Sequence, residues 1–325
     1  MIKAAILGMG RWGQNLHQSV IHSDVISITQ VCTRSPDKVK SYCEEHNIAL
    51  TSDFDEVLSN AEIDAVILAT PHTQHYQQIM QSAQANKHVF AEKPFTLSAS
   101  EAKSALEALS EKNLTVGIGH NRRFAPNTQK LKSMLDQGLL GEITYIDGMF
   151  SAHMAGSKGQ WRDSRAESPA GGMTSLGIHV IDMFLHLAGE MVSVSAQSKQ
   201  LQTHCEFDDA TIVNINFKAG FSGILTTLTS APMQWKIRVY GTEGWAELDE
   251  QDTLQYLLQG EERQTLHFEG YDYPVLTTIG AGLEDFARAI LEQKPFAIST
   301  EEILHATAVL DGIFRSVEQG APVNI

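Results

Sequence analysis

The chain has 325 residues, of which 42% are hydrophobic and 19% are charged, a composition typical of a folded protein with two domains. Its 24 basic and 39 acidic residues give a formal net charge of -15, which argues against nucleic acid or an anionic membrane as the main partner. The three cysteines, Cys32, Cys43 and Cys205, form no CxxC pair, so a disulfide framework or a cysteine zinc site is not expected.

The first 120 residues alternate short apolar runs with longer amphipathic stretches. The N-terminal run is too short for a signal peptide, and no window approaches the roughly 20 apolar residues of a membrane span, so we expect a cytoplasmic protein. Strands are predicted at Lys3–Leu7, Val25–Cys32, Ala65–Ala69, His88–Ala91 and Thr115–Ile118, and helices at Arg11–Ile21, Pro36–His46, His72–Ala85 and Ser98–Ser110. Apolar strands joined by crossover helices predict a doubly wound parallel sheet over residues 1–121.

The first predicted strand is followed by GMGRWG, a G-x-G-x-x-G pattern. Gly8 permits a tight turn, Gly10 lets the backbone approach a pyrophosphate, and Gly13 lets the helix pack against the strand. The helix N-terminus at Arg11 and Trp12 offers free N–H groups to an anion. The pattern alone also occurs in ordinary tight turns, but a strand before it and a helix after it favour a dinucleotide-binding Rossmann domain.

The identity of the dinucleotide is predicted from the end of the second strand, roughly 20 positions after the last glycine. An acidic residue there would bind both ribose hydroxyls, but this chain has Thr33, followed by Arg34, Ser35 and, further on, Lys38. Hydroxyl groups and a guanidinium suit a 2′-phosphate, so NADP is preferred over NAD. The alternative is that Arg34 is simply solvated after the strand.

A second candidate segment, TPHTQH, follows the strand Ala65–Ala69 at the edge where ligands bind in open α/β sheets. We expect Thr70, Pro71, His72 and His75 to line the cofactor site. The i, i+3 spacing of the two histidines also allows a pair of metal ligands, an alternative that we do not favour.

The next strand ends in AEKP. A strand end is a rigid mount, and Pro94 restricts the backbone of Lys93, so the ammonium can be held where a reaction needs a proton. The alternative is an ordinary surface lysine at a strand end. We place Glu92 and Lys93 with the cofactor-binding residues as well.

After about residue 125 the pattern changes to successive strands with turns and few helices between them. Strands are predicted at Ile143–Phe150, Met191–Leu201, Ala210–Phe217, Gly223–Thr229, Ile237–Tyr240 and Gly244–Leu248, and closing helices at Leu283–Leu291 and Thr300–Gln319. Alternation of apolar and polar residues indicates a sheet with one covered face. Residues 122–325 are therefore predicted to form an α+β domain with a large, mostly antiparallel sheet.

Several motifs together carry a family resemblance. They are the glycine loop, TP-x-x-x-H followed by HVFAEKP, GHNRRF at 119–124, GEI at 141–143, AGG at 170–172, GIHVID at 177–182 and GTEG at 241–244. With them the chain resembles the Gfo/Idh/MocA family of NAD(P)-dependent oxidoreductases over nearly its whole length. The resemblance implies hydride transfer between nicotinamide and a secondary alcohol of a sugar, polyol or cyclic diol. It also implies a homodimer or homotetramer formed through the open face of the second sheet.

The resemblance implies that Lys93 and His179, the histidine of the family's G-x-H-x-x-D motif, are catalytic. It places Asp182, the aspartate of that motif, and Ser175 among the substrate-binding residues. A histidine can accept the hydroxyl proton near neutral pH, while the lysine stabilises the developing charge. Many relatives have an aspartate four residues before the histidine, where this chain has Ser175. A serine cannot hold negative charge beside an imidazolium, so an inositol-type substrate is in doubt. His179, Asp182 and His186 mimic a metal set by spacing, but the family needs no metal.

Further substrate-binding candidates are Trp161 and Arg162, because an aromatic face beside a guanidinium suits a polyhydroxylated or carboxylate-bearing ligand. Asn121, Arg123 and His153 are additional candidates, against ordinary packing or surface roles. A different class of function remains open, since some relatives are regulatory proteins that bind a dinucleotide or ligand without catalysis. The lysine of AEKP favours the enzyme, because a sensor has no need of it.

Overall fold

The computed structural model describes residues 1–269 and 274–325, and its chain divides into two compact units. The first unit comprises Met1–Asn121 and Val275–Leu304, and the second comprises Arg122–Pro274 and His305–Ile325. The sequence analysis placed all of residues 122–325 in one domain, whereas by contacts a segment near the C-terminus groups with the first unit.

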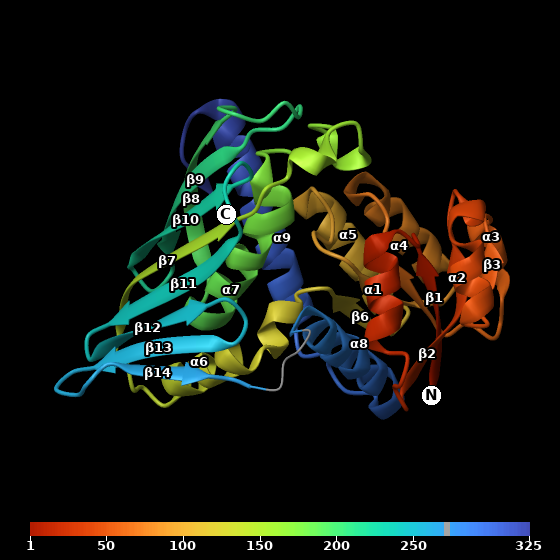
Figure 1. The fold of residues 1–325 in the computed structure, drawn as a ribbon, viewed down its shortest axis with the longest axis horizontal. Helices are drawn as coiled ribbons and strands as arrows, with labels where there is room; N and C mark the ends of the chain where they lie inside the picture. Colours follow the sequence, from red (N-terminus) through yellow and green to blue (C-terminus); the bar gives the residue numbers. More distant parts are fainter. Residues whose placement is uncertain (270–273) are drawn as a thin grey trace. The chain divides into compact units, whose positions relative to one another are not determined.

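The first unit is built on a six-stranded parallel sheet with the order β3-β2-β1-β4-β5-β6 (Figure 1). Its strands are β1 (Ile2–Leu7), β2 (Ile26–Cys32), β3 (Ala49–Thr51), β4 (Ala65–Leu68), β5 (His88–Ala91) and β6 (Val116–Ile118). All four residues of β4 are buried, as expected for a strand covered on both faces. The chain winds away from β1 in both directions, so the topological switch point lies between β1 and β4.

The helices of the first unit are α1 (Arg11–Ser19), α2 (Lys40–Glu45), α3 (Phe54–Ser59), α4 (His75–Gln84), α5 (Ala99–Ser110) and α8 (Pro274–Glu292). Helix α8 docks on α1 through a glycine, because a Cβ on Gly280 would lie 2.5 Å from the carbonyl oxygen of Ser19. Farther along α8, the Phe286 ring packs edge-on against Phe90 of β5, with centroids 5.6 Å apart. These two contacts fix the helix to the parallel sheet.

The second unit contains a nine-stranded sheet with the order β14-β13-β12-β11-β7-β10-β9-β8-β15. Its strands are β7 (Ile143–Ser151), β8 (Met191–Lys199), β9 (Ala210–Phe217), β10 (Ser222–Leu228), β11 (Gln234–Gly241), β12 (Gly244–Asp249), β13 (Thr253–Leu258), β14 (Gln264–His267) and β15 (Val323–Asn324). Strands β7 and β10 pair in parallel, while the other neighbours are antiparallel.

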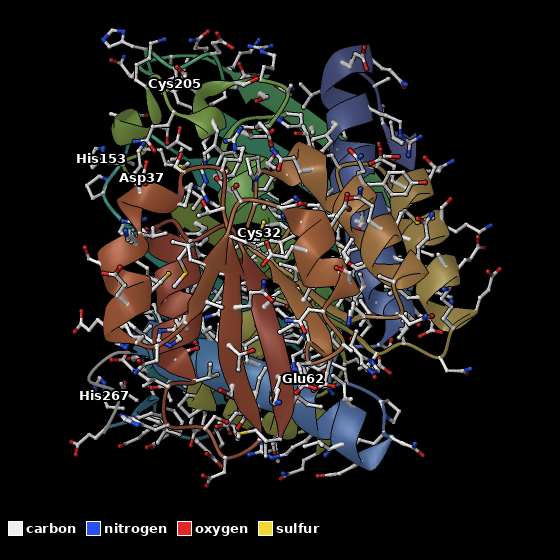
Figure 2. All side chains as sticks on the ribbon, turned by 90° about the vertical axis from the view of Figure 1, so that its right-hand side faces the viewer. Cys32, Asp37, Glu62, His153, Cys205 and His267 are labelled. Carbon is white, nitrogen blue, oxygen red and sulfur yellow. The ribbon has the colours of Figure 1, made fainter. Side chains whose placement is uncertain are left out.

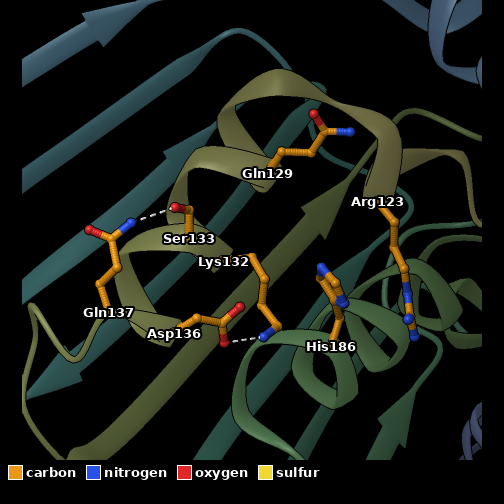
Figure 3. Close-up of a pocket in the computed structure, with 7 residues that line it drawn as sticks. All are labelled: Arg123, Gln129, Lys132, Ser133, Asp136, Gln137 and His186. Atoms are coloured by element: carbon orange, nitrogen blue, oxygen red, sulfur yellow. Dashed lines mark hydrogen bonds and ion pairs between the residues drawn. The ribbon is translucent and has the colours of Figure 1, made fainter. Parts of the chain in front are cut away.

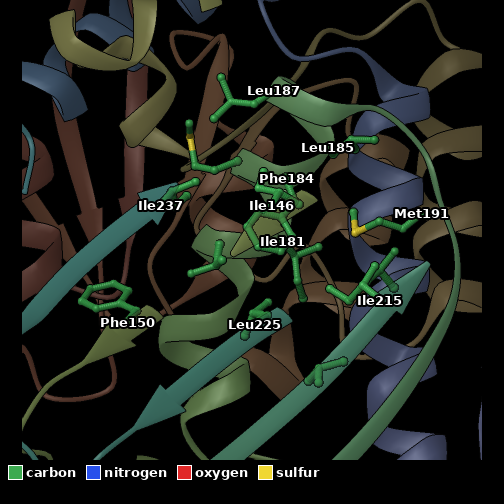
Figure 4. Close-up of a cluster of buried hydrophobic side chains, with 14 of the residues drawn as sticks. Ile146, Phe150, Ile181, Phe184, Leu185, Leu187, Met191, Ile215, Leu225 and Ile237 are labelled. Atoms are coloured by element: carbon green, nitrogen blue, oxygen red, sulfur yellow. The ribbon is translucent and has the colours of Figure 1, made fainter. Parts of the chain in front are cut away.

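One face of this sheet is covered by α6 (Pro126–Asp136), α7 (Ile178–Ala188) and α9 (Thr300–Gln319) (Figure 1). Figure 4 shows the resulting core, in which Phe184 and Ile181 of α7 lie among strand residues such as Leu225. The helix can approach β7 closely only because that strand has a glycine, since a Cβ on Gly148 would lie 2.5 Å from Val180 Cγ1. Helix α7 therefore packs closely against β7 at Gly148.

The predicted fold class is confirmed: a Rossmann-like parallel sheet is followed by a mostly antiparallel one. The sequence analysis missed several elements, namely β3, α3, α6, β13, β14 and β15. The helix predicted at Pro36–His46 is divided into a 3₁₀ turn, Pro36–Lys38, and α2, because Val39 between them has φ -125° and ψ 4°. Among the described residues, no helix has the length and apolar character needed to cross a membrane.

Three aromatic side chains join α1 to α2 in the first unit. His17 Nδ1 lies 2.7 Å from the hydroxyl oxygen of Tyr42, and the His17 and His46 rings are 4.9 Å apart. Burial, together with the charge of the nearby His46, lowers the pKa of His17 to about 4. The fold therefore holds His17 neutral.

This cluster predicts acid-sensitive stability. The folded-state pKa of His17 is below the unfolded value, so its contribution is complete above pH 6.5 and is lost as the pH falls toward 4. We expect up to about 3 kcal/mol of unfolding free energy to be lost in that window. Urea unfolding of the wild type and His17→Gln at pH 7 and pH 5 measures it: the variant should lose less stability on acidification. An equal loss in both proteins would contradict the assignment.

Candidate functional site

The glycine loop after β1 has the geometry of a phosphate cradle. Gly8 has φ +93°, and a Cβ there would lie 2.5 Å from the carbonyl oxygen of Ala69, so only glycine fits. A Cβ on Gly13 would lie 2.2 Å from the Gly8 carbonyl oxygen. By contrast, a Cβ on Gly10 would meet no described atom within 4 Å. The first and third glycines thus serve close packing, and the second leaves open space above the backbone, as a pyrophosphate requires.

The N-terminus of α1 opens beside this space. Gly10 is the N-cap and supplies no side chain to bond the first N–H groups of the helix, which remain available to an anion. Arg11 is exposed, whereas Trp12 is half-buried, and its indole N–H is shielded from solvent without an acceptor among the described residues. These residues fit the diphosphate of a dinucleotide.

The end of β2 presents the segment predicted to bind the adenosine ribose. Arg34, Ser35 and Lys38 are exposed, and Thr33 is half-buried, with its N–H donating to the Thr51 carbonyl at 3.1 Å. Cys32, just before them, lies at the opposite end of the sheet from Glu62, while Asp37 lies near the carboxyl edge (Figure 2).

The Cys32 thiol is not a reactive group at this edge. Burial, together with the nearby carboxylates of Asp53 and Glu56, raises its pKa to about 11. Cys32 therefore stays a thiol at neutral pH.

His75 joins the loop after β4 to the loop after β5. It is fully buried, with Nδ1 2.9 Å from the Pro94 carbonyl oxygen and Nε2 3.2 Å from the Thr70 carbonyl oxygen. Both carbonyls only accept, so a neutral imidazole donates to one of them and an imidazolium to both. The Thr70 hydroxyl donates to Gln78 Oε1 at 2.6 Å, and the His72 ring, also buried, lies 6.1 Å from His75. His75 thus fastens the loop that contains Lys93.

Lys93 is half-buried at the carboxyl end of β5, and its peptide bond to Pro94 is cis. Its neighbour Glu92 is 6% exposed and lies against β6: a Cβ on Gly119 would come within 2.6 Å of Glu92 Oε1. The predicted cofactor residues of the first unit therefore share one edge of the parallel sheet, as the strand ends require.

In the second unit, His179 lies in the first turn of α7. A π-helix, Met173–Gly177, leads into this turn, and such segments are frequent at functional sites. The His179 ring is buried and lies 5.9 Å from the Phe150 ring. Ser175, also buried, places its hydroxyl 3.5 Å from the Met154 sulfur.

Asp182 and Arg123, both predicted to bind substrate, are bonded to each other. Arg123 Nε donates to both carboxylate oxygens at 3.0 and 3.1 Å, and Nη2 donates to Oδ1 at 2.7 Å. Both side chains are buried, so the pair holds the start of the unit to α7. The Asn121 amide, likewise buried, donates to the Thr278 hydroxyl at 2.7 Å within the first unit.

Arg123 also reaches a surface groove of about 400 Å³ between α6 and α7 (Figure 3). The residues that line this groove are Arg123, Gln129, Lys132, Ser133, Asp136, Gln137 and His186. Lys132 pairs with Asp136, and Gln137 donates to Ser133. Polar groups of this groove are thus bonded to one another. His186 faces it and is not gathered into a metal set: among the described residues, no group of three or more metal-type side chains occurs.

Trp161 and Arg162 form a stacked pair on a fastened loop. The Arg162 guanidinium carbon lies 4.1 Å from the centre of the Trp161 ring. The neighbouring Asp163 accepts from the N–H groups of Gly159 and Glu206 at 2.8 and 2.9 Å, which lowers the pKa of its carboxyl group. His153 is exposed on the same loop (Figure 2).

Sequence reasoning missed Arg122, whose guanidinium lies against two neighbouring aromatic rings. Its guanidinium carbon is 3.9 Å from the centre of the Trp235 ring and 4.7 Å from that of Phe150. The only sequence signal was its place in GHNRRF, and that motif does not tell which arginine is bonded and which is stacked.

A Rossmann unit with an open phosphate cradle, joined to an α+β unit with a buried histidine, defines a dinucleotide-dependent oxidoreductase.

Comparisons with known proteins agree. The pattern of the "Oxidoreductase family, NAD-binding Rossmann fold" matches residues 2–120, and that of the "GFO/IDH/MocA C-terminal domain" matches residues 128–247. The scyllo-inositol 2-dehydrogenase (NAD(+)) of Bacillus subtilis (strain 168) is 30% identical over 254 residues, which span 75% of this chain and 72% of that protein. The scyllo-inositol 2-dehydrogenase (NADP(+)) of the same organism is 29% identical over 209 residues, 64% of this chain and 58% of that protein.

The structure of levoglucosan dehydrogenase in complex with NADH and levoglucosan shares the fold, with a TM-score of 0.90, 21% identity and coverage of 100% of this chain and 99% of that one. The chain belongs to the Gfo/Idh/MocA family of oxidoreductases. It is an NAD(P)-dependent oxidoreductase, and the roles of its individual site residues stay predictions.

The glycine loop yields a direct test. Gly10→Ala should leave the melting temperature unchanged, since its Cβ meets open space, but should weaken NADPH binding at least roughly tenfold by blocking the backbone. Gly156→Ala, whose Cβ also meets open space, is the matched control with unchanged affinity. Titration of protein fluorescence with NADPH measures both, and wild-type affinity in Gly10→Ala would contradict the cradle.

Proposed function

We propose that this protein transfers a hydride between nicotinamide and a secondary alcohol carbon of a sugar, polyol or cyclic diol. The observation that carries the proposal is the place of Lys93, a half-buried lysine on the same sheet edge as the open glycine cradle. In open α/β sheets that edge binds the ligand. A lysine there serves chemistry at the bound nicotinamide better than it serves solubility.

The substrate class is supported by the relatives. Two of them are named as scyllo-inositol dehydrogenases, and a protein of the same fold is named levoglucosan dehydrogenase. Cyclic polyhydroxylated compounds are common to these names. We carry this class over, and leave open which member is used and in which direction.

In the proposed mechanism, a dinucleotide held at Gly8, Gly10 and Gly13 would accept or supply the hydride. Lys93 donates a hydrogen bond to the reacting oxygen and stabilises its negative charge as the C–H bond breaks. His179 takes the hydroxyl proton in oxidation and returns it in reduction, which a group with a near-neutral reference pKa can do. The ring packing against Phe150 fixes the orientation of His179.

Ser175 sets this chain apart from relatives with an aspartate at that position. Its hydroxyl bonds weakly to a sulfur and cannot supply negative charge to the imidazole. We therefore propose that His179 acts with Lys93 alone, without a carboxylate beside its imidazole. The same feature supports the second candidate, a regulatory protein that binds dinucleotide without turnover.

We further propose NADP as the preferred cofactor, because the exposed side chains of Arg34, Ser35 and Lys38, with the half-buried Thr33 beside them, match a 2′-phosphate. A homodimer or homotetramer formed through the uncovered face of the second sheet is also proposed. Exposed apolar side chains on that sheet, Val192 at 40% and Ile212 at 51%, support it.

Replacement of the lysine tests the enzyme. Lys93→Met should lower kcat by roughly 10²- to 10⁴-fold on sugars, cyclitols and dihydrodiols, with NADPH affinity retained. Lys103 of α5 has an exposed side chain, so Lys103→Met is the control and should keep full activity. Wild-type rates in Lys93→Met would end the mechanism, and tight NADPH binding by a wild type that turns over no substrate would favour the regulatory protein.

The cofactor preference has its own test. Arg34→Ala should weaken NADPH binding roughly tenfold or more, through loss of a charge-assisted contact, and leave NADH binding little changed. Lys40→Ala, exposed at the start of α2, is the control for general loss of positive charge. Isothermal titration with both dinucleotides gives the ratio, and equal effects on both would remove the NADP assignment.

A further inference from the structure

Arg122 is a cation held by aromatic faces. Trp235 of β11 and Phe150 of β7 are directly opposite each other in the sheet register, and the guanidinium lies over both rings. Planar stacking suits arginine, because its weakly hydrated charge tolerates a ring on its face. The two rings are 5.2 Å apart and nearly perpendicular, at 80°, so they border the guanidinium on two sides.

The edge of this guanidinium has no acceptor among the described residues. None of its N–H groups donates to a residue in the described ranges, and Nη1 is also shielded from solvent. The carboxylate whose charge acts on Arg122 is that of Glu250. Its Oε1 accepts a hydrogen bond from the backbone N–H of Trp235 at 3.1 Å. A buried donor without an acceptor is unfavourable, so the arrangement points to a ligand as the missing partner.

The two neighbours of Arg122 in GHNRRF differ from it, because their side chains are hydrogen-bonded within the protein. Asn121 on one side bonds Thr278, and Arg123 on the other pairs with Asp182. Arg122 alone of these three keeps its donors unbonded to any described residue, and the residue as a whole is half-buried. Burial lowers the pKa of Arg122 to about 10, which still leaves it charged at neutral pH.

Arg122 is also close to the predicted base. The centre of the Phe150 ring lies 4.7 Å from the Arg122 guanidinium carbon and 5.9 Å from the centre of the His179 ring. One side chain therefore lies next to both residues. A ligand group bound by Arg122 would therefore be within one substrate's length of His179.

We propose that Arg122 binds a carboxylate of the substrate, so that the substrate is an acidic sugar or polyol, of the uronic or aldonic acid class. The inference rests on the proposed function and names its substrate class. Two carboxylate oxygens match two N–H groups of a guanidinium edge, and the rings hold that edge ready. A neutral polyol would leave one of these donors with a weaker partner.

Matched pairs of probes test this inference: D-glucuronate against D-glucose, and D-gluconate against D-glucitol. Wild-type protein with NADPH bound should prefer the carboxylate member of each pair in isothermal titration, and in kcat/KM where turnover occurs. Arg122→Met should weaken the acid member roughly 10- to 100-fold and change the neutral member little. Arg122→Lys, which keeps the charge but not the planar fork, should fall between and decides the matter if the methionine variant does not fold. Arg315→Met, an exposed arginine of α9, is the control.

The outcomes separate this inference from the proposed function. Arg122-dependent carboxylate binding without turnover supports the inference and contradicts the dehydrogenase. Turnover of neutral polyols equally by wild type and Arg122→Met, with no preference for acids, overturns the inference and leaves the dehydrogenase standing. If neither carboxylate binds the wild type at millimolar concentration, or if the variant weakens both members of a pair equally, Arg122 is only a structural brace.

Discussion

The approach of two backbones at Gly8 and Ala69 is the constraint on which the first unit depends. The backbones meet at the switch point, where a Cβ on Gly8 would lie 2.5 Å from the Ala69 oxygen. The next residue, Thr70, offers its carbonyl to His75, and the same imidazole reaches the Pro94 carbonyl. His75 thereby connects the loop at the glycine turn to the loop that contains Lys93, and so helps to position the lysine. A side chain at residue 8 would disturb the phosphate cradle and the lysine together.

The fold could be predicted from the sequence wherever its signal is local. Buried apolar runs gave the strands of the parallel sheet, and alternation in segments such as Ala210–Phe217 gave the second sheet. The placement of α8 could not be predicted, because it depends on Gly280 against Ser19 and on Phe286 against Phe90, contacts remote in sequence. Short elements such as β3, with three residues, are too brief for a periodic pattern.

The candidate site shows the same division. Glycine spacing and strand ends place the cofactor residues on one edge, because topology alone dictates where strand ends meet. Which of two adjacent arginines is bonded is decided by tertiary packing. Arg123 has a carboxylate from α7 within reach, while Arg122 points to two rings on the sheet. No propensity or spacing rule distinguishes them, so the sequence analysis selected Arg123 and passed over Arg122.

These two arginines are opposite solutions to the burial of a cation. A carboxylate accepts hydrogen bonds from Nε and Nη2 of Arg123 and offsets its charge. Aromatic faces stabilise Arg122 without using its hydrogen-bonding edge, so its charge remains available. The net charge of -15 does not prevent an anion from binding there, because charges farther away than about 8 Å are largely screened at physiological salt. At contact distance the local cation outweighs the global charge, and an acidic substrate can bind an acidic protein.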